Sequence, residues 1–437
     1  MSDLSRLPSI DKLLSEPQLA AFSHRIAVKA ARAAVDEARN GLPAESILER
    51  ALQLALSLDR SPHRPAINCS GTIMNTGLGR SRLAKSAVEA VQRVAAHHSS
   101  LEIDLETGKR GDRQAPLEAL LQELTGAEAA LVVNNNAGAV LLAVHTFAAA
   151  GSVLLSRGQS VEIGGAFRMP DVVQAAGARL IDVGCTNKTR LSDYAEAIET
   201  DTKVILRCHP SNFKMSGFVD EPLAEELAGL ANEHGLVLID DVGSGCLFRT
   251  DELGLPHEPT LSEALQSGAH VVTASGDKLL GATQAGILLG SAEHIAQLKG
   301  NPMARALRID KLTAAGLETT LRLAAENRWD EIPTYRALTR TNEEMLARAE
   351  RIVAAVGEGE IAEGTCEPGG GSLPGVVLPS KRIGFPGKDP ETLAASLRSG
   401  ETPVIGYIEK GSFWIDLRAL EEDDVQLLIG ELKRALA

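Results

Sequence analysis

The sequence predicts an α/β protein with a mainly parallel central sheet, preceded by a small helical domain and followed by an α+β domain. Between about residues 66 and 320, short apolar segments alternate with longer stretches of helical spacing. That alternation is typical of strands buried on both faces of a parallel sheet and joined by crossover helices. The first 64 residues show helical spacing alone, and residues 321–437 end in a hairpin pattern and a helix.

The helical domain is expected over residues 1–64. Pro17 stands at the first position of a helix expected over residues 17–39, and Pro43 begins a second one. This domain carries nine Lys or Arg and eight Asp or Glu, whereas the whole chain has a net charge of −14. Its electrostatic character therefore differs from that of the remainder.

The central domain, residues 65–320, is expected to contain seven strands. The seven segments lie at 129–134, 152–156, 178–183, 203–208, 236–240, 270–274 and 286–290. The third domain covers residues 321–437. Its expected elements are a helix, a glycine-rich stretch, two strands of a hairpin and a final helix, at 342–357, 368–375, 403–408, 412–417 and 421–436.

Composition excludes several classes of protein. A net charge of −14 over 437 residues argues against a chain coated in basic surface for non-specific nucleic-acid binding, although one basic patch would fit. The five cysteines form no C-x-x-C pair, which argues against a zinc site or a disulfide framework and fits a reduced cytoplasm. We expect no signal peptide and no membrane span.

Polar residues follow four of the expected strands. Asp241, Lys278 and Asn212 each come just after one strand, and the turn 135–138 leads from another strand into a helix. Because ligands bind beyond the carboxyl ends of strands in open α/β sheets, these groups are expected to converge on one edge.

This set of groups matches the needs of pyridoxal phosphate (PLP). The cofactor requires a lysine for a Schiff base, a carboxylate at the pyridine nitrogen, a donor to the ring hydroxyl and a helix N-terminus for the phosphate. Lys278, Asp241 and Asn212 would supply the first three. The phosphate would bind the turn and a nearby hydroxyl, namely Asn135, Asn136, Ala137, Gly138 and Ser275.

Each of these residues also has an ordinary interpretation. A lone lysine after a strand is usually solvated, an aspartate there is usually a helix cap, and asparagine runs are usually turns. Residues 243–248 contain no G-x-G-x-x-G motif, so a dinucleotide cofactor has little support. The combination, rather than any one residue, favours PLP.

At the same residues the chain resembles the bacterial selenocysteine synthases, the L-seryl-tRNA(Sec) selenium transferases. The likeness covers nearly the whole length and rests on an ordered set of segments. They are "LPSIDKLL" (7–14), "INCSGTIMNTGLGR" (67–80), "LEIDLETGKRGDR" (101–113), "VVNNNAGAV" (132–140), "SRGQSVEIGGAFRMPDVV" (156–173), "HPSNFKMSGF" (209–218), "SGDKLLGATQAGI" (275–287), "NPMARALRIDKLT" (301–313) and "GGGSLPG" (369–375). The resemblance implies a PLP-dependent transferase of fold type I, the aspartate-aminotransferase fold.

The resemblance also implies a reaction and its residues. Seryl-tRNA(Sec) would become selenocysteinyl-tRNA(Sec) through a PLP aldimine on Lys278 and a dehydroalanyl intermediate, with Asp277 assisting proton transfer or hydroxyl departure. Selenophosphate, the selenium donor, would be held by Arg80, Arg305 and Arg308, whose planar guanidinium groups suit an oxyanion. Without the family, Arg305 and Arg308 would be read as a solvated helix face.

The resemblance further implies that residues 1–64 read the tRNA. Arg25, Lys29 and Arg32 lie at helical spacing and form either a basic face for phosphates or an ordinary solvated face. A homo-oligomer is expected, at least a dimer and a decamer by resemblance. Glu162 would either face the cofactor or cap a helix.

Several positions near the expected site depart from the usual family pattern. They are Gly77, Cys185, Pro210, Ala282 and Thr283. These departures keep two alternatives open. One is a PLP-dependent β-eliminating lyase of the same lineage that acts on a small amino acid or amino sugar without tRNA. The other is an RNA-binding or assembly protein with an inactive site.

Overall fold

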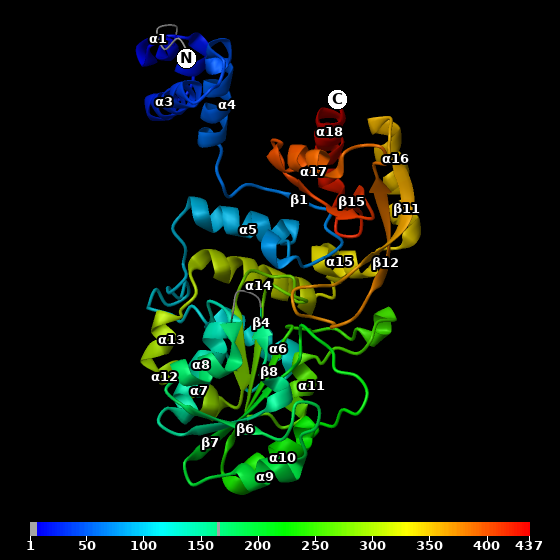
Figure 1. The fold of residues 1–437 in the computed structure, drawn as a ribbon. Helices are drawn as coiled ribbons and strands as arrows, with labels where there is room; N and C mark the ends of the chain where they lie inside the picture. Colours follow the sequence, from blue (N-terminus) through cyan, green and yellow to red (C-terminus); the bar gives the residue numbers. More distant parts are fainter. Residues whose placement is uncertain (1–6, 164–166) are drawn as a thin grey trace. The chain divides into compact units, whose positions relative to one another are not determined.

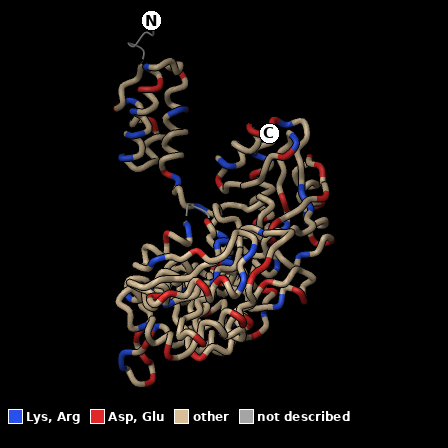
Figure 2. The backbone as a smooth tube through the Cα atoms, turned by 60° about the horizontal axis from the view of Figure 1, so that its bottom comes forward, with Lys and Arg blue, Asp and Glu red and all other residues tan. Residues whose placement is uncertain are grey.

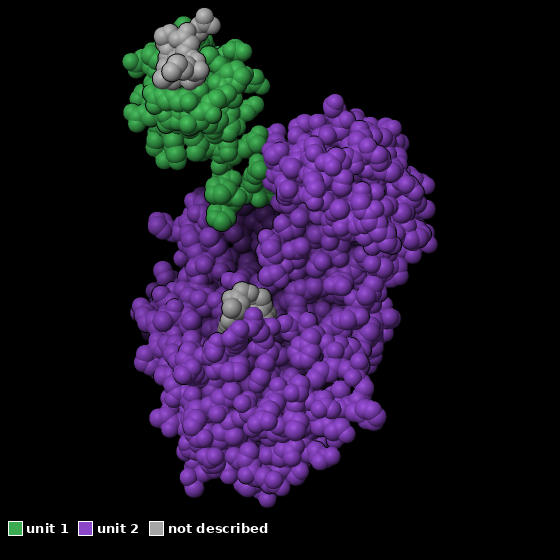
Figure 3. All heavy atoms as spheres, viewed as in Figure 1, with its two compact units in different colours: residues 1–65 green, residues 66–437 purple. Residues whose placement is uncertain are grey.

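The computed structural model describes residues 7–163 and 167–437. The chain divides into two compact units, residues 1–65 and residues 66–437 (Figure 3). Residues 164–166, inside the segment 156–173 quoted above, lie outside the described residues, as do residues 1–6 of the expected helical domain. Among the described residues, no helix is long and apolar enough to cross a membrane.

The N-terminal unit is helical. Its elements are α1 (Ile10–Leu14), α2 (Pro17–Ala20), α3 (His24–Arg39), the short 3-10 helix η2 (Ala44–Ser46) and α4 (Ile47–Asp59). The prediction of one helix over residues 17–39 was wrong, because the chain leaves helical geometry at Ser23 (φ −58°, ψ 143°). This break lets the short α2 fold back and bury Leu19 completely in the alanine-rich core between α3 and α4.

A seven-stranded sheet forms the centre of the second unit (Figure 1). In spatial order its strands are β2 (Ala129–Val133), β10 (Gly286–Gly290), β9 (Val271–Ser275), β8 (Val237–Gly243), β7 (Thr202–Cys208), β3 (Ser152–Ser156) and β6 (Arg179–Val183). Strand β10 is antiparallel to both of its neighbours, and every other pair is parallel. Each of the seven expected strand segments falls on one of these strands.

Helices cover both faces of this sheet because its strands are apolar on both sides. One face packs against α6 (Ala115–Thr125), α9 (Leu191–Ala197), α10 (Ala224–His234), α11 (Leu261–Gln266) and α14 (Lys311–Ala325). The other packs against α7 (Asn136–Ala148), α8 (Met169–Ala175) and α12 (Ala292–Gly300). Alternate residues of each strand pack into the apolar cores on opposite faces of the sheet, as Leu238 and Ile239 do in β8. Helix α5 (Lys85–Ala96) packs on α14.

The remainder of the second unit is an antiparallel α+β assembly. Its sheet has the order β11 (Glu360–Cys366), β12 (Leu378–Gly384), β15 (Ser412–Asp416) and β14 (Tyr407–Glu409), and its helices are α16 (Asn342–Val356), α17 (Pro390–Ser399) and α18 (Val425–Leu436). The predicted hairpin is the β14–β15 pair. The start of its first segment instead forms β13 (Val404–Ile405), which pairs in parallel with β1 (Ile67–Asn68).

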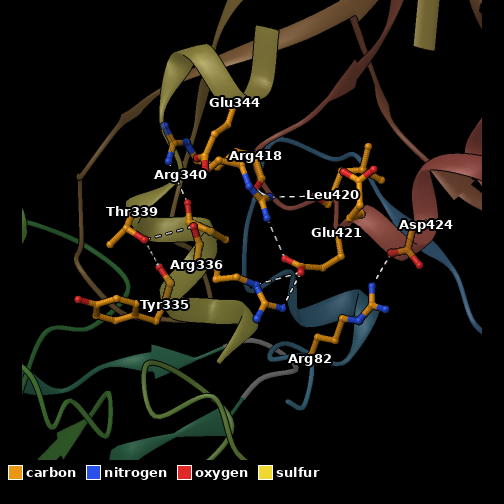
Figure 4. A network of polar contacts seen from close by, with 12 residues as sticks. Arg82, Tyr335, Arg336, Thr339, Arg340, Glu344, Arg418, Leu420, Glu421 and Asp424 are labelled. Atoms are coloured by element: carbon orange, nitrogen blue, oxygen red, sulfur yellow. Dashed lines mark hydrogen bonds and ion pairs between the residues drawn. The ribbon is translucent and has the colours of Figure 1, made fainter. Parts of the chain in front are cut away.

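Arginines of α15 (Pro333–Thr339) and the residue after it bind the segment that follows β15 (Figure 4). Glu421 accepts from Arg336 at 2.6 Å and from Arg340 at 3.0 Å, at the end of α15. Arg340 and Arg418 are buried and donate to backbone carbonyls, so these charges are paired or hydrogen-bonded. Arg82, which lies beyond β1, pairs with Asp424.

Candidate active site

The predicted polar residues meet at the carboxyl edge of β8 and β9. Asp241 lies within β8, and Lys278 follows the end of β9 by three residues. Both are buried, with 7 % and 5 % of their surface exposed. The lysine backbone is fixed from two sides, since the Ser81 hydroxyl donates to its carbonyl at 2.6 Å and the Gly281 N–H at 2.9 Å.

The Lys278 amine has few polar contacts. Its Nζ lies 3.5 Å from the Gly371 carbonyl oxygen. Burial lowers the pKa of Lys278, and nearby Arg80 lowers it further, whereas the carboxylates of Asp241, Asp277 and Glu258 oppose that change. A buried amine with a depressed pKa is more often neutral, which is the form that attacks a carbonyl.

Asp241 is held by two donors to one oxygen. Its Oδ1 accepts from Asn136 Nδ2 and from Thr273 Oγ1, each at 2.8 Å. Burial raises the pKa of Asp241, while those two hydrogen bonds and the charge of Lys278 lower it. Its Oδ2 accepts no hydrogen bond from any described residue and is therefore available to a further partner.

The turn 135–138 opens α7, and two of its side chains have hydrogen-bond partners within the protein. Asn135 caps the helix by accepting from the Gly138 N–H at 2.8 Å, and Asn136 orients Asp241. The N–H groups of Asn136 and Ala137, in the first turn, have no intrahelical partner and remain for an anion. A cavity of about 400 Å³ opens here, lined in part by Asn135, Ala137, Gly138 and Arg168.

Two other predicted cofactor residues differ in their placement. Ser275 ends β9 and is buried, and it forms no side-chain hydrogen bond with any described residue. Asn212 is exposed, and its amide donates to the Glu162 carbonyl at 2.7 Å. The structure therefore does not bring the Asn212 amide into contact with Lys278 or Asp241. Glu162 itself pairs with Arg168 at 2.6 Å.

Asp277 forms an ion pair with Arg80. Asp277 Oδ2 lies 2.8 Å from Arg80 Nη1, and the two side chains are 7 % and 23 % exposed. Asp277 Oδ1 is buried without a partner. The pair borders a cavity of about 410 Å³, which is lined by Thr76, Gly79, Arg80, Ser81, Leu83, Asp277, Ala282, Thr283 and Gln284. Two of the departures from the family pattern, Ala282 and Thr283, thus line this cavity.

The other two predicted anion-binding arginines lie apart from that cavity's lining. Arg308 Nη1 pairs with Glu102 at 3.1 Å, and Glu102 also binds Arg113. Arg305, on α13 (Pro302–Ala306), is exposed and forms no hydrogen bond or ion pair with any described residue. A single chain therefore does not assemble the three guanidinium groups around one anion.

Sequence reasoning missed four residues around the lysine. Gly371 supplies the carbonyl at Nζ, and a Cβ there would lie 3.1 Å from Ser211 Oγ. Glu258 is 1 % exposed, and His209 Nε2 lies 3.9 Å from its Oε2. The sequence offered two signals for them, the glycine-rich stretch 368–375 and the segment 209–218 after a strand, but neither indicates a contact with Lys278.

The site has the composition that PLP requires. Several buried polar atoms near it lack partners, including Asn136 Oδ1, His209 Nε2, Ser244 Oγ and Asp277 Oδ1. Gly243 and Gly371 keep side chains away from the Lys278 amine, because a Cβ at either would lie 3.7 or 3.5 Å from Nζ. The described residues contain no group of His, Cys, Asp or Glu suited to a metal ion. The residues present therefore fit a flat, anionic, amine-reactive cofactor.

Comparison with known proteins gives two matches to family profiles. Residues 66–421 match the profile described as L-seryl-tRNA selenium transferase. Residues 4–39 match the profile described as selenocysteine synthase N terminal.

Individual relatives cover almost the whole chain. The L-seryl-tRNA(Sec) selenium transferase of Hyphomonas neptunium is 46 % identical over 97 % of this chain and 96 % of that protein. The protein of the same name from Geobacter sulfurreducens is 41 % identical over 99 % of each chain. Among solved structures, D-glucosaminate-6-phosphate ammonia-lyase aligns with a TM-score of 0.59 at 22 % identity, over 85 % of this chain and 96 % of that one. That last likeness concerns the fold.

Proposed function

This chain belongs to the L-seryl-tRNA selenium transferase family, and from that premise we propose that it converts seryl-tRNA(Sec) to selenocysteinyl-tRNA(Sec). The observation that carries the proposal is the buried Lys278 between Asp241 and Asp277 at the carboxyl edge of the sheet. Pyridoxal phosphate is the cofactor, and when bound it draws electrons from the substrate's Cα and so eases loss of the α-proton.

The chain's own residues divide the remaining work. Lys278 holds the cofactor and, once displaced, accepts the α-proton at its Nζ. Asp241 places negative charge at the ring nitrogen through its free Oδ2. The start of α7 and Ser275 hold the phosphate, and Asn212 remains our proposed donor to the ring hydroxyl.

Asp277 is proposed to move a proton to the departing serine hydroxyl. Arg80 fixes its Oδ2, and its Oδ1 is buried and without a hydrogen-bond partner, so that oxygen is available for the transfer. Loss of the hydroxyl leaves a double bond between Cα and Cβ. Selenium from the donor then bonds to Cβ, Lys278 Nζ returns a proton to Cα, and cleavage of the selenium–phosphorus bond by water releases phosphate.

Selenophosphate is the proposed donor, held by Arg80, Arg305 and Arg308. Because Arg308 pairs with Glu102 and Arg305 extends into solvent, one chain does not suffice for this site. We therefore propose a homo-oligomer, at least a dimer and a decamer by the family resemblance. A cytoplasmic location is proposed with it.

The N-terminal unit is proposed to contact the tRNA. Arg25, Lys29 and Arg32 of α3 are exposed, and none of the three forms a hydrogen bond or ion pair with any described residue. They lie on the face of α3 opposite its buried residues, such as Ile26 and Ala27, so their charges face solvent. Figure 2 marks the basic and acidic positions of this unit. Free cations on one helix face suit phosphate contacts.

The two alternatives are not favoured. Relatives at 40–46 % identity carry the selenium transferase name over nearly their whole length, whereas the likeness to an ammonia-lyase is one of fold. An inactive RNA-binding protein would have no need for a buried lysine surrounded by unpartnered polar atoms.

The test is a conversion assay with the full chain, PLP, selenophosphate and tRNA charged with radioactive serine. Selenocysteine on tRNA(Sec), but not on tRNA(Ser), is the expected product, and Lys278→Ala is the control. Elimination from free small amino acids with no product on tRNA(Sec) would favour the lyase. No product from any substrate, together with tRNA binding, would favour the inactive RNA-binding protein.

A further inference from the structure

Glu258 is a buried carboxylate outside the set of residues used above. It is 1 % exposed, and its Oε1 is buried without a hydrogen-bond partner. Its backbone N–H donates to Thr250 Oγ1 at 2.9 Å, and that hydroxyl donates to the Pro256 carbonyl at 2.8 Å. A buried, under-bonded carboxylate is costly, so its position calls for a reason.

The carboxylate contacts a loop that reaches the active-site lysine. Glu258 Oε2 accepts from the Leu373 N–H at 3.0 Å. Two residues earlier in the same loop, the Gly371 carbonyl lies 3.5 Å from Lys278 Nζ. The backbone from Gly371 to Leu373 therefore contacts the Lys278 amine at one end and the Glu258 carboxylate at the other.

The loop adopts a backbone conformation and a close approach to its neighbours that its glycines allow. Gly369, Gly370 and Gly371 have φ values of 70°, 65° and 74°, a backbone that side chains rarely adopt. A Cβ at Gly369 would lie 2.2 Å from Thr72 Cγ2. Leu373, also at positive φ (50°), is 2 % exposed and packs in an apolar cluster. The Leu373 N–H is thus fixed by both packing and its bond to Glu258.

His209 faces the same carboxylate. Its Nε2 lies 3.9 Å from Glu258 Oε2 and has no hydrogen-bond partner. Its backbone N–H donates to the Asp241 carbonyl at 3.0 Å, so the imidazole is anchored to the strand that carries Asp241. Among the described residues, the Leu373 N–H donates to this buried acid, and the imidazole lies nearby beyond hydrogen-bond distance.

We propose that Glu258 is a positioning residue for Lys278, which acts by holding Leu373 so that the Gly371 carbonyl is directed at the lysine amine. Four charged groups act on that amine. They are Asp241 on β8, the adjoining Asp277, Arg80 in the segment after β1, and Glu258 itself. Glu258 also adds negative charge that keeps the pKa of Lys278 from falling further.

This inference rests on the proposed role of Lys278 but is tested apart from the tRNA reaction. The full chain, with and without added PLP, is compared with Glu258→Gln and Glu258→Ala. Hydrogen exchange of the amides in residues 369–375 reports the loop. Acetylation of Lys278 as a function of pH, followed by mass spectrometry without PLP, reports the amine.

Two distinct results are expected. Glu258→Ala should speed amide exchange in the loop by about tenfold or more, because the Leu373 N–H loses its acceptor. Glu258→Gln keeps an acceptor of the same shape, so the loop should change little, while acetylation of Lys278 should begin at lower pH because a nearby negative charge is gone. With PLP bound, the pH dependence of the cofactor's visible absorbance should shift in Glu258→Gln as well.

Glu421→Gln is the matched control. This variant removes the charge of another buried carboxylate, which pairs with Arg336 and Arg340. It should leave Lys278 acetylation unchanged. Unchanged loop exchange in Glu258→Ala together with unchanged acetylation in Glu258→Gln would overturn the proposal. Fast exchange of the Leu373 amide in the unaltered chain would overturn it without any variant. A chain that passes these tests yet makes no selenocysteine would instead refute the proposed function.

Discussion

Arg80 and Asp277 form an ion pair of 2.8 Å immediately before the active-site lysine. Arg80 does so from a left-handed backbone conformation (φ 63°), while the next residue, Ser81, donates to the carbonyls of Asp277 and Lys278. Two consecutive residues therefore hold both the side chain and the backbone of the Asp277–Lys278 pair.

Arg80→Ala should lower kcat by about 100-fold or more, since Asp277 loses its fixed orientation and the proposed selenophosphate site loses one of its arginines. Steady-state conversion of seryl-tRNA(Sec) measures it. The neighbouring Arg82→Ala is the control, because Arg82 pairs with Asp424 and not with the site. Equal losses in both variants would show that Arg80 acts on the fold and not on Asp277.

Lys278→Met should stabilise the cofactor-free protein at neutral pH. The pKa of Lys278 is lowered in the folded state, so the unfolded chain binds the proton more readily. Stability is therefore lost as pH falls from the unfolded value of 10.5 toward the folded one, and a neutral side chain avoids that loss. Urea unfolding at several pH values measures it. The gain of the variant should shrink as pH rises toward 10.5, and a gain that is constant with pH would contradict the prediction.

Asp241→Asn should weaken PLP binding and lower kcat by about 100-fold, because a neutral amide cannot keep the ring nitrogen protonated. Cofactor affinity by fluorescence titration and kcat measure the two effects. Thr273→Ser keeps a hydroxyl for Asp241 Oδ1 and is expected to retain most activity. If Asp241→Asn bound the cofactor and turned over normally, Asp241 would not be the ring-nitrogen partner.

Gly316→Ala in α14 should destabilise the chain by about 1–3 kcal/mol, although alanine is the better helix former. The added Cβ would lie 2.5 Å from Thr283 Cγ2. Removing that methyl group with Thr283→Ser should restore most of the loss and keep the hydroxyl that donates to the Thr313 carbonyl at 3.0 Å. Urea unfolding of the two single variants and the double variant measures the coupling.

The central sheet was predictable because its strands are apolar on both faces and short enough to stand out from the helices. Strand β11 was not, since its sequence "EIAEGTC" is polar and half exposed, and nothing in it alternates clearly. The break at Ser23 was also missed, because it accompanies the burial of Leu19 against α3 and α4, a tertiary contact that the local pattern does not show.

The site was predictable where a residue type and its place after a strand determine its role, as for Lys278 and Asp241. It was not predictable where tertiary contacts decide. Asn136 is an example, since the sequence suggests a role for its backbone N–H at the start of a helix but gives no sign that its side-chain amide donates to Asp241. Glu258 and His209 reach the site from separate loops, and no local pattern joins them.

The pairing of β1 with β13 has a consequence for how the chain is made. Ile67 lies opposite Val404, so the beginning of the second unit is completed by residues synthesised near its end. The glycine loop that touches Lys278 packs against Thr72 and Met74, and it too is translated late. On the ribosome, the first unit has its own core and can fold early, whereas the catalytic centre stays incomplete until almost the entire polypeptide has emerged. A nascent or prematurely terminated chain that lacks residues 369–371 therefore lacks the backbone that contacts Lys278 Nζ in the complete fold.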